Sequence, residues 1–223
     1  MDNDTVLKSK YGFTLIEKAY HPRMEDTEII LHNIIKLYKE HFCVQSIPAF
    51  SVINDPTAEC PYINREHHEI HISCVYVHWS QIAYQFCHEL CHYMIPREVP
   101  HALRWFEESI CALASFYFMN ILSDVWQEKS LLHAAEYGKK IKLYALNEFQ
   151  NPDVFDLVSL SDPSSAISQA FSKKDGEYDR RKNKYIATRL LPFFLEQPVL
   201  SPIRCKNSAR WRAAAYKKSI WCC

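Results

Sequence analysis

The chain has 223 residues, of which 48% are hydrophobic and 23% charged, and its 26 basic residues balance 26 acidic ones. This length and composition suit a single globular domain, or one domain with a subdomain. Because only three glycines occur, the composition disfavours a phosphate-binding loop, a dinucleotide-binding fingerprint and a repeat-rich β fold.

The first hundred residues combine predicted strands with one helix. Residues 11–20 and 47–54 are rich in aromatic and β-branched side chains, which predicts strands. Between them, residues 24–42 place apolar side chains at helical spacing, with acids before bases as the helix dipole favours. Residues 69–79 alternate apolar and polar side chains, which predicts a third strand.

The rest of the chain is predicted to be mostly helical. Residues 81–95 form an expected helix with Ser80 as its N-cap, and Pro96 ends it. Apolar patterns predict further helices at 104–122, at 124–149, around Pro192 at 185–196, and in the basic segment 208–221. The polar residues 172–184 read as an exposed connection. The expected fold class is therefore α+β.

Charge and cysteine content suggest a cellular setting. Residues 173–223 hold 13 lysines and arginines against four acids. They form either a solvated surface packed on an acidic body or a contact for an acidic partner, membrane or nucleic acid. Nine cysteines and an N-terminus without an apolar signal region predict reduced thiols in a cytoplasmic protein. The best apolar run, residues 110–122, is shorter than the ~18 residues that a membrane span needs.

The segment QFCHELCHYM, residues 85–94, contains His88, Glu89 and His92 in an H-E-x-x-H pattern. Residues four apart share one face of a helix, so both imidazoles can bind one zinc ion. Glu89 lies beside them, where a carboxylate can take a proton from a zinc-activated water. The pattern therefore predicts a zinc site with Glu89 as its general base.

A third zinc ligand is expected from the segment WFEES, residues 105–109, because catalytic zinc usually has three protein ligands and an open position. Glu108 follows His92 by sixteen residues, on the next predicted helix, and Glu107 is the neighbouring candidate. Both acids also fit a solvated helix start. Glu98 has the spacing of a third candidate, but Ile95 replaces the glycine that the tight turn before it needs.

HELCH followed by WFEES resembles the gluzincin metallopeptidases of the thermolysin-like superfamily, with Ser109 where their second motif commonly has glycine. The resemblance covers about residues 45–120. It implies a small zincin-like catalytic domain at 1–122, followed by a helical subdomain at 123–223. It also implies zinc held by His88, His92 and Glu108, peptide hydrolysis with Glu89 as base, and substrate binding along an edge strand at 69–77. A downstream oxyanion donor is expected from one of four residues: His101, His133, Tyr178 or Tyr185.

Several alternatives remain open. Cys87 and Cys91 could form a thiol site, although small cysteines filling a helix interface explain them better. His67, His68 and His71 could bind a second metal, or they are polar edge residues. The chain could also be an inactive zincin-like module that binds through its basic C-terminal region, or an α+β domain with a chance HELCH match. For the leading interpretation we expect a peptide or protein substrate, no nucleic acid and no membrane span.

Overall fold

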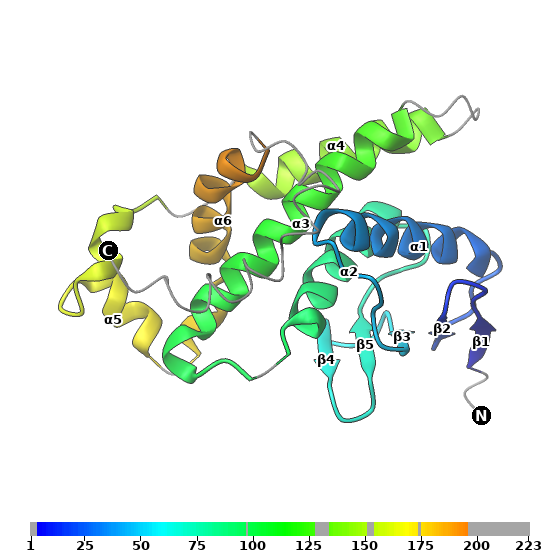
Figure 1. The fold of residues 1–223 in the computed structure, drawn as a ribbon, viewed down its shortest axis with the longest axis horizontal. Coiled ribbons are helices and arrows are strands. Elements are labelled where there is room, and N and C mark those ends of the chain that lie inside the picture. Colours follow the sequence, from blue (N-terminus) through cyan, green and yellow to red (C-terminus); the bar gives the residue numbers. More distant parts are fainter. Residues whose placement is uncertain (1–3, 97, 128–133, 151–153, 174, 196–223) are drawn as a thin grey trace.

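The structure is a computed structural model that describes residues 4–96, 98–127, 134–150, 154–173 and 175–195 (Figure 1). The strands are β1 (Thr5–Lys8), β2 (Phe13–Glu17), β3 (Phe50–Asn54), β4 (Tyr62–Asn64) and β5 (Glu69–Ile72). The helices are α1 (Met24–His41), α2 (Trp79–Met94), α3 (Arg104–Gln127), α4 (Ala134–Phe149), α5 (Ala166–Ser172) and α6 (Arg180–Leu195). Short 3-10 helices are η1 (His101–Leu103), η2 (Leu157–Ser161) and η3 (Gly176–Tyr178). This arrangement confirms the α+β class.

The five strands form one mixed sheet in the order β1-β2-β3-β5-β4. The strands β2, β3 and β5 run parallel, while β1 and β4 pair antiparallel with their neighbours at the two edges. The expected edge strand at 69–77 is therefore wrong, because β5 pairs on both sides and β4 occupies the edge. With three residues, β4 is too short for apolar alternation to reveal it in the sequence.

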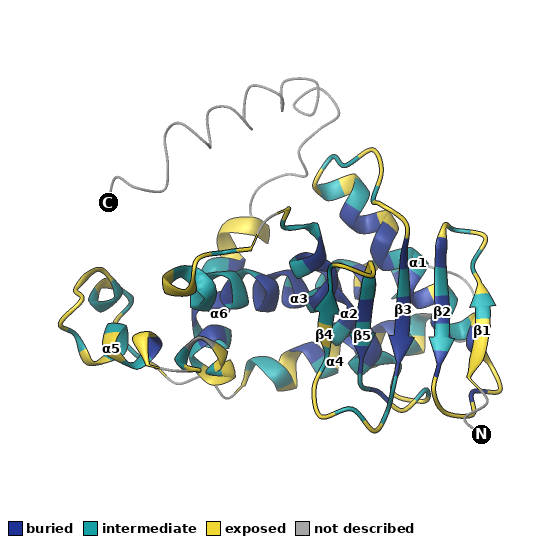
Figure 2. Cartoon of the chain, turned by 90° about the horizontal axis from the view of Figure 1, so that it is seen from below, coloured by how far each residue is buried: buried dark blue, intermediate teal, exposed yellow. Residues whose placement is uncertain are grey.

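Helices cover one face of the sheet, and the core lies between the two layers (Figure 2). Along β2 the side chains of Phe13, Leu15 and Glu17 are buried, and those between them are less so. Helix α1 packs fully buried Ile30 and Ile34 into the same core. Full burial of such a side chain stabilises the fold by about 1.5–3 kcal/mol. This core holds α1 and α2 against the sheet.

Helix α2 matches the expected helix closely but begins earlier. It starts at Trp79 after the N-cap residue His78, so the prediction of Ser80 as N-cap is wrong. His78 makes no side-chain capping bond. At the other end, Ile95 is extended and Pro96 follows, as the sequence predicts.

Helix α3 is longer than expected and runs without interruption from Arg104 to Gln127. The predicted helix at 124–149 is wrong at its start, because residues 124–127 belong to α3 and the described part of α4 begins at Ala134. By length and composition, residues 101–127 could cross a membrane, but 67% of the apolar window is buried inside the protein. The boundary proposed at residues 122 and 123 falls within this helix.

The prediction of an exposed connection at residues 172–184 is wrong in part, because helical segments lie within it. Residues 172–184 contain η3 and the first turn of α6 rather than an unstructured link. Asp179 caps this turn by accepting from Lys182 N at 3.2 Å. At Gly176, an added Cβ would lie 2.2 Å from Ala170 O, so the close packing of η3 on α5 needs glycine. The basic helix expected at 208–221 lies outside the described residues.

Candidate metal centre

Two histidines on α2 project from the same side of the helix. His88 and His92 are four residues apart, so both imidazoles lie on one face, while Leu90 on another face is fully buried. The end of α2 is held by Arg65, whose Nη1 and Nη2 donate to Ile95 O at 2.8 Å and His92 O at 2.6 Å. This guanidinium fixes the turn that carries His92.

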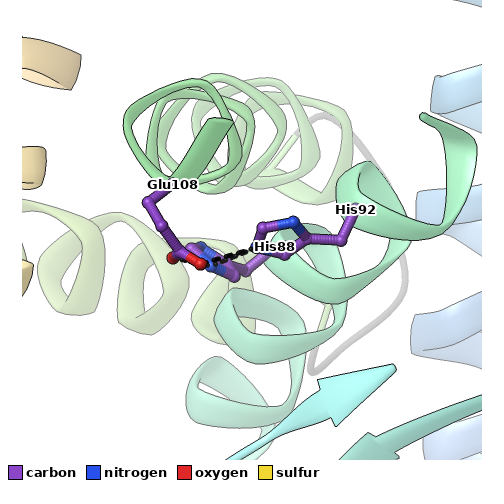
Figure 3. A group of neighbouring side chains, drawn as sticks. All are labelled: His88, His92 and Glu108. Carbon is purple, nitrogen blue, oxygen red and sulfur yellow. Dashed lines mark hydrogen bonds and ion pairs between the residues drawn. The ribbon is translucent and has the colours of Figure 1, made fainter. Parts of the chain in front are cut away.

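Glu108 on α3 meets both histidines (Figure 3). Its Oε2 lies 3.2 Å from His88 Nε2, its Oε1 lies 3.4 Å from His92 Nε2, and the two Nε2 atoms are 3.2 Å apart. Ligand atoms around a tetrahedral zinc ion with bonds of about 2.0–2.1 Å would lie roughly 3.3–3.4 Å apart. His88, His92 and Glu108, hereafter the metal group, therefore form a cluster that could bind a metal ion.

Glu107 stands behind His92 and does not belong to the metal group. Its Oε1 lies 2.8 Å from His92 Nδ1. With the proton on Nδ1, His92 donates to Glu107 and turns the lone pair of Nε2 toward His88 and Glu108. Histidine ligands of metals commonly have such a carboxylate partner. The two adjacent acids therefore have different positions, one within the metal group and one supporting it.

The charges of the metal group stabilise one another. Burial disfavours a charged imidazole at His92, but hydrogen bonds with Glu107 and Glu108 raise its pKa to about 10. Burial also disfavours a carboxylate at Glu108, yet hydrogen bonds from His88 and His92 lower its pKa to about 2. A divalent cation would supply the positive charge that protons otherwise provide here.

Glu89 lies in the same helical turn and lines the same cavity. Its side chain is buried, and this burial raises its pKa, although the nearby charges of His88 and His92 oppose the rise. A carboxyl beside the two histidines can accept a proton and later release it. Glu89 is therefore suited to the role of general base.

The metal group opens into a cavity of about 720 Å³ between the first half of the chain and the C-terminal helices. Its walls come from β4 and the residues before it, and from α2, α3, α4, η3 and α6. Its charged or titratable lining includes Arg65, His88, Glu89, His92, Glu98, Arg104, Glu107, Glu108, Glu148, Arg180 and Lys184. A bound molecule would therefore touch both halves of the protein.

The structure separates the other expected site residues. Glu98 lines the cavity but is exposed and outside the metal group. His68 Nδ1 lies 3.0 Å from Tyr93 Oη, and His71 Nε2 lies 3.2 Å from Glu69 Oε2. Within the described residues, the histidines at 67, 68 and 71 do not form a metal-binding group.

Of the four candidates for an oxyanion donor, Tyr178 lines the cavity. His101 and Tyr185 are not among its lining residues, and Tyr185 instead packs against the ring of Phe155. His133 lies outside the described residues. The position of Tyr178 on η3 keeps it as the candidate among the described residues.

The three cysteines between α2 and α3 are packing residues, whereas Cys60 is free, exposed and lines the cavity. Cys87, Cys91 and Cys111 are free and buried around the contact between α2 and α3, as expected. Burial raises the pKa of Cys87 and Cys111 well above the ordinary value, so neither is a reactive thiolate. Cys43 is disulfide-bonded, so the expectation of reduced thiols fails at that position.

Four features in and around the cavity were not visible in the sequence. The support of His92 by Glu107 depends on the approach of α2 to α3. The edge position of β4 depends on sheet order, and Arg180 reaches the cavity because α6 packs along α3. The link between Ser109 Oγ and Asn183 Oδ1, at 3.2 Å, spans 74 residues of sequence. Short-range periodicity carries no signal for contacts of this kind.

Comparisons of the chain with protein-family models, with curated proteins and with solved structures gave no match. A function is therefore inferred from the residues and the geometry of the cavity.

Proposed function

We propose that the protein is a zinc-dependent peptidase. The observation that carries the proposal is the convergence of His88 Nε2, His92 Nε2 and the Glu108 carboxylate at the base of a cavity that Glu89 also lines. Three protein ligands leave an open coordination position, which is the arrangement of catalytic zinc sites. The zincin-like identity of the fold belongs to the same proposal.

The donor atoms fit zinc. Two imidazole nitrogens and one carboxylate oxygen suit this borderline ion, and their separations match a tetrahedral site. Two histidines and a carboxylate also hold Fe(II) in some oxygenases. Glu89 favours the hydrolytic interpretation, because a buried carboxylate beside the ligands can serve as a base for water.

The chain's own residues would supply the proton transfers. When bound, zinc would polarise the scissile carbonyl and activate a water molecule. The Glu89 carboxylate would accept the proton of the attacking water and pass it to the departing amine. Glu107 would hold the proton on His92 Nδ1 throughout, so that His92 Nε2 stays available as a ligand.

The edge strand β4 offers a place for an extended peptide. Its residues Tyr62 and Ile63 line the cavity, and among the described strands β4 pairs with β5 alone. The other side of a strand at the edge of a sheet presents main-chain donors and acceptors to which a peptide can add as a further strand. This geometry supports a peptide as the substrate.

Glu89→Gln tests the proposal. We expect the variant to bind zinc like the parent protein and to hydrolyse a peptide pool at least about 100-fold more slowly, because general base catalysis typically contributes that much or more. Normal hydrolysis by the variant would contradict the mechanism. Zinc binding without any hydrolysis by the parent protein would instead favour the inactive binding module.

A further inference from the structure

The cavity contains several positive side chains, and most of them are already engaged. Arg65 donates to the main chain at the end of α2. Lys184 binds Glu148 of α4 and lies 5.6 Å from the ring centre of Tyr84. Arg104 also has an interaction within the protein. These three cations therefore already interact with other groups of the protein.

Arg180 is different. It is the first residue of α6, it is exposed, and it lines the cavity. Within the described residues it makes no hydrogen bond and no ion pair. Its side chain shares the lining of this cavity with His88 and Glu89. The cavity lining thus contains an arginine whose side chain has no partner among the residues that the structure describes.

The acids of the cavity do not account for this arginine. Glu107 and Glu108 contact the histidines, and Glu148 binds Lys184. Glu98 is exposed on the segment before η1 and makes no ion pair with Arg180. Among the described residues no acid forms an ion pair with Arg180, so its guanidinium is open to a bound molecule or to solvent.

We propose that Arg180 is the specificity-determining residue of the cavity and binds a carboxylate of the substrate. The proposal rests on the peptidase function proposed above. A guanidinium binds a carboxylate through two parallel hydrogen bonds, which fix both position and orientation. Such an anchor on α6 would hold a peptide at one point while β4 aligns its main chain.

The carboxylate has two sources in a peptide. It is the free C-terminus, which makes the protein a carboxypeptidase, or the side chain of an aspartate or glutamate near the scissile bond. Both present the same planar group to Arg180. The substrate class is therefore a peptide with an acidic group close to the bond that is cut.

The test compares three pools of acetylated pentapeptides with the zinc-loaded protein. One pool has free C-termini, the second is amidated, and the third is amidated with aspartate or glutamate fixed at each position in turn. Cleavage rates and sites are measured by mass spectrometry for the parent, for Arg180→Gln, and for Arg189→Gln as a control at an exposed arginine of the same helix outside the cavity.

We expect the parent to prefer one of the two acidic pools over the plain amidated pool. Arg180→Gln should lose this preference by about 10- to 100-fold, the effect of a charged hydrogen bond. The loss should appear mainly in KM, while Arg189→Gln keeps the preference. A preference for the free C-terminal pool assigns the carboxylate to the terminus, and one for the third pool assigns it to a side chain. Equal cleavage of all pools by the parent, or an unchanged preference in Arg180→Gln, would overturn the proposal.

A second measurement separates this proposal from the peptidase function itself. Peptides retained by zinc-loaded Glu89→Gln, and by Glu89→Gln carrying Arg180→Gln as well, are identified after ultrafiltration. Retention of acidic peptides that depends on Arg180 supports the anchor even where the parent hydrolyses nothing, in which case the peptidase proposal alone fails. Retention that ignores the acidic group contradicts the anchor whatever the hydrolysis shows.

Discussion

Two of the places where glutamate and histidine come together in the protein differ in their access to the cavity. The metal group joins α2 to α3 at the base of a cavity. The second place, hereafter the buried carboxylate cluster, consists of Glu17, His21 and Asn54 near the carboxyl ends of β2 and β3. Asn54 Nδ2 donates to Glu17 Oε2 at 2.8 Å, and His21 Nε2 lies 3.7 Å from Glu17 Oε1. All three residues are buried, and none lines the cavity.

The difference shows what makes a candidate site. In the metal group every charged atom faces an opposite charge or a donor, and three ligand atoms converge. In the buried carboxylate cluster Glu17 Oε1 lacks a hydrogen-bond partner within the described residues, and its burial raises the pKa of Glu17 to about 7. Proximity of glutamate to histidine is therefore not enough to indicate a metal site. The metal group differs from the buried carboxylate cluster because its three ligand atoms converge and because it opens into the cavity.

The largest expected effect comes from replacing one histidine with alanine, either in the metal group or in the buried carboxylate cluster. His88→Ala removes a ligand and should lower peptide hydrolysis by more than about 100-fold, beyond the 10–100-fold cost of losing a supporting residue. His21→Ala should leave zinc affinity unchanged but destabilise the fold by about 1–3 kcal/mol, because Thr27 Oγ1 and Arg23 N lose a partner. Zinc titration, activity assays and urea unfolding of both variants check this contrast. If His88→Ala and His21→Ala changed zinc affinity equally, the metal group would not differ from the buried carboxylate cluster in zinc binding.

The next effect is a pH dependence located at Glu17. Burial raises its pKa from 4.5 to about 7, although the hydrogen bond from Asn54 opposes the rise. Folding therefore favours the protonated acid, so stability is retained below about pH 4.5, falls as the pH rises toward 7, and stays lower above it. The total loss is about 3 kcal/mol at 1.36 kcal/mol for each pKa unit.

Glu17→Gln should remove this loss, because glutamine stays neutral. The stability of the variant relative to the parent should increase by about 3 kcal/mol between pH 4.5 and pH 8. Unfolding curves measured across this range test the expectation. A parallel pH dependence in parent and variant would show that Glu17 ionises as readily in the folded protein as in the unfolded chain.

A smaller effect is expected at Glu107. Glu107→Gln weakens the partner of His92 Nδ1 while leaving the three ligands in place, so zinc affinity should fall by about 10–100-fold. Glu98→Gln is the matched control, as an exposed acid of the same cavity outside the metal group. Calorimetric titration with zinc compares the two. Complete loss of binding in Glu107→Gln would instead make Glu107 a ligand.

The smallest effect is expected at Thr27, which contacts His21 of the buried carboxylate cluster. Its hydroxyl lies 2.9 Å from His21 Nε2. Thr27→Val keeps the shape of the side chain and removes this hydrogen bond, which should cost about 1 kcal/mol of stability. Thermal unfolding measures the change, and zinc affinity should stay as in the parent. A change in zinc affinity would show that the two clusters are coupled.

The sequence predicted the parts of the site that depend on local periodicity. His88, Glu89 and His92 lie on one helix, so their spacing alone predicts their shared face. Glu108 was predicted through the resemblance of the WFEES segment, and the approach of α3 to α2 places it beside both histidines. The sequence did not separate the position of Glu108 from that of Glu107, because adjacent helical residues differ only in direction.

Contacts between segments that are distant in the sequence could not be predicted from the sequence. The bond from Asn54 to Glu17 spans 37 residues and depends on the parallel register of β2 and β3. Arg180 reaches the cavity only through the packing of α6 on α3. The start of α6 was read as an exposed connection because its first turn is polar, and Asp179 stabilises that turn through a cap. Tertiary packing decided each of these features.

The measurement that tests the central claim most directly is zinc titration of the full-length, untagged protein beside Glu108→Ala. The account predicts one zinc ion per chain in the parent, and a loss of affinity in Glu108→Ala that exceeds the loss in Glu107→Gln. The parent should also bind zinc in preference to iron(II) under anaerobic conditions. Absence of zinc binding in the folded parent, or equal affinity in parent and Glu108→Ala, would contradict the assignment of the metal group.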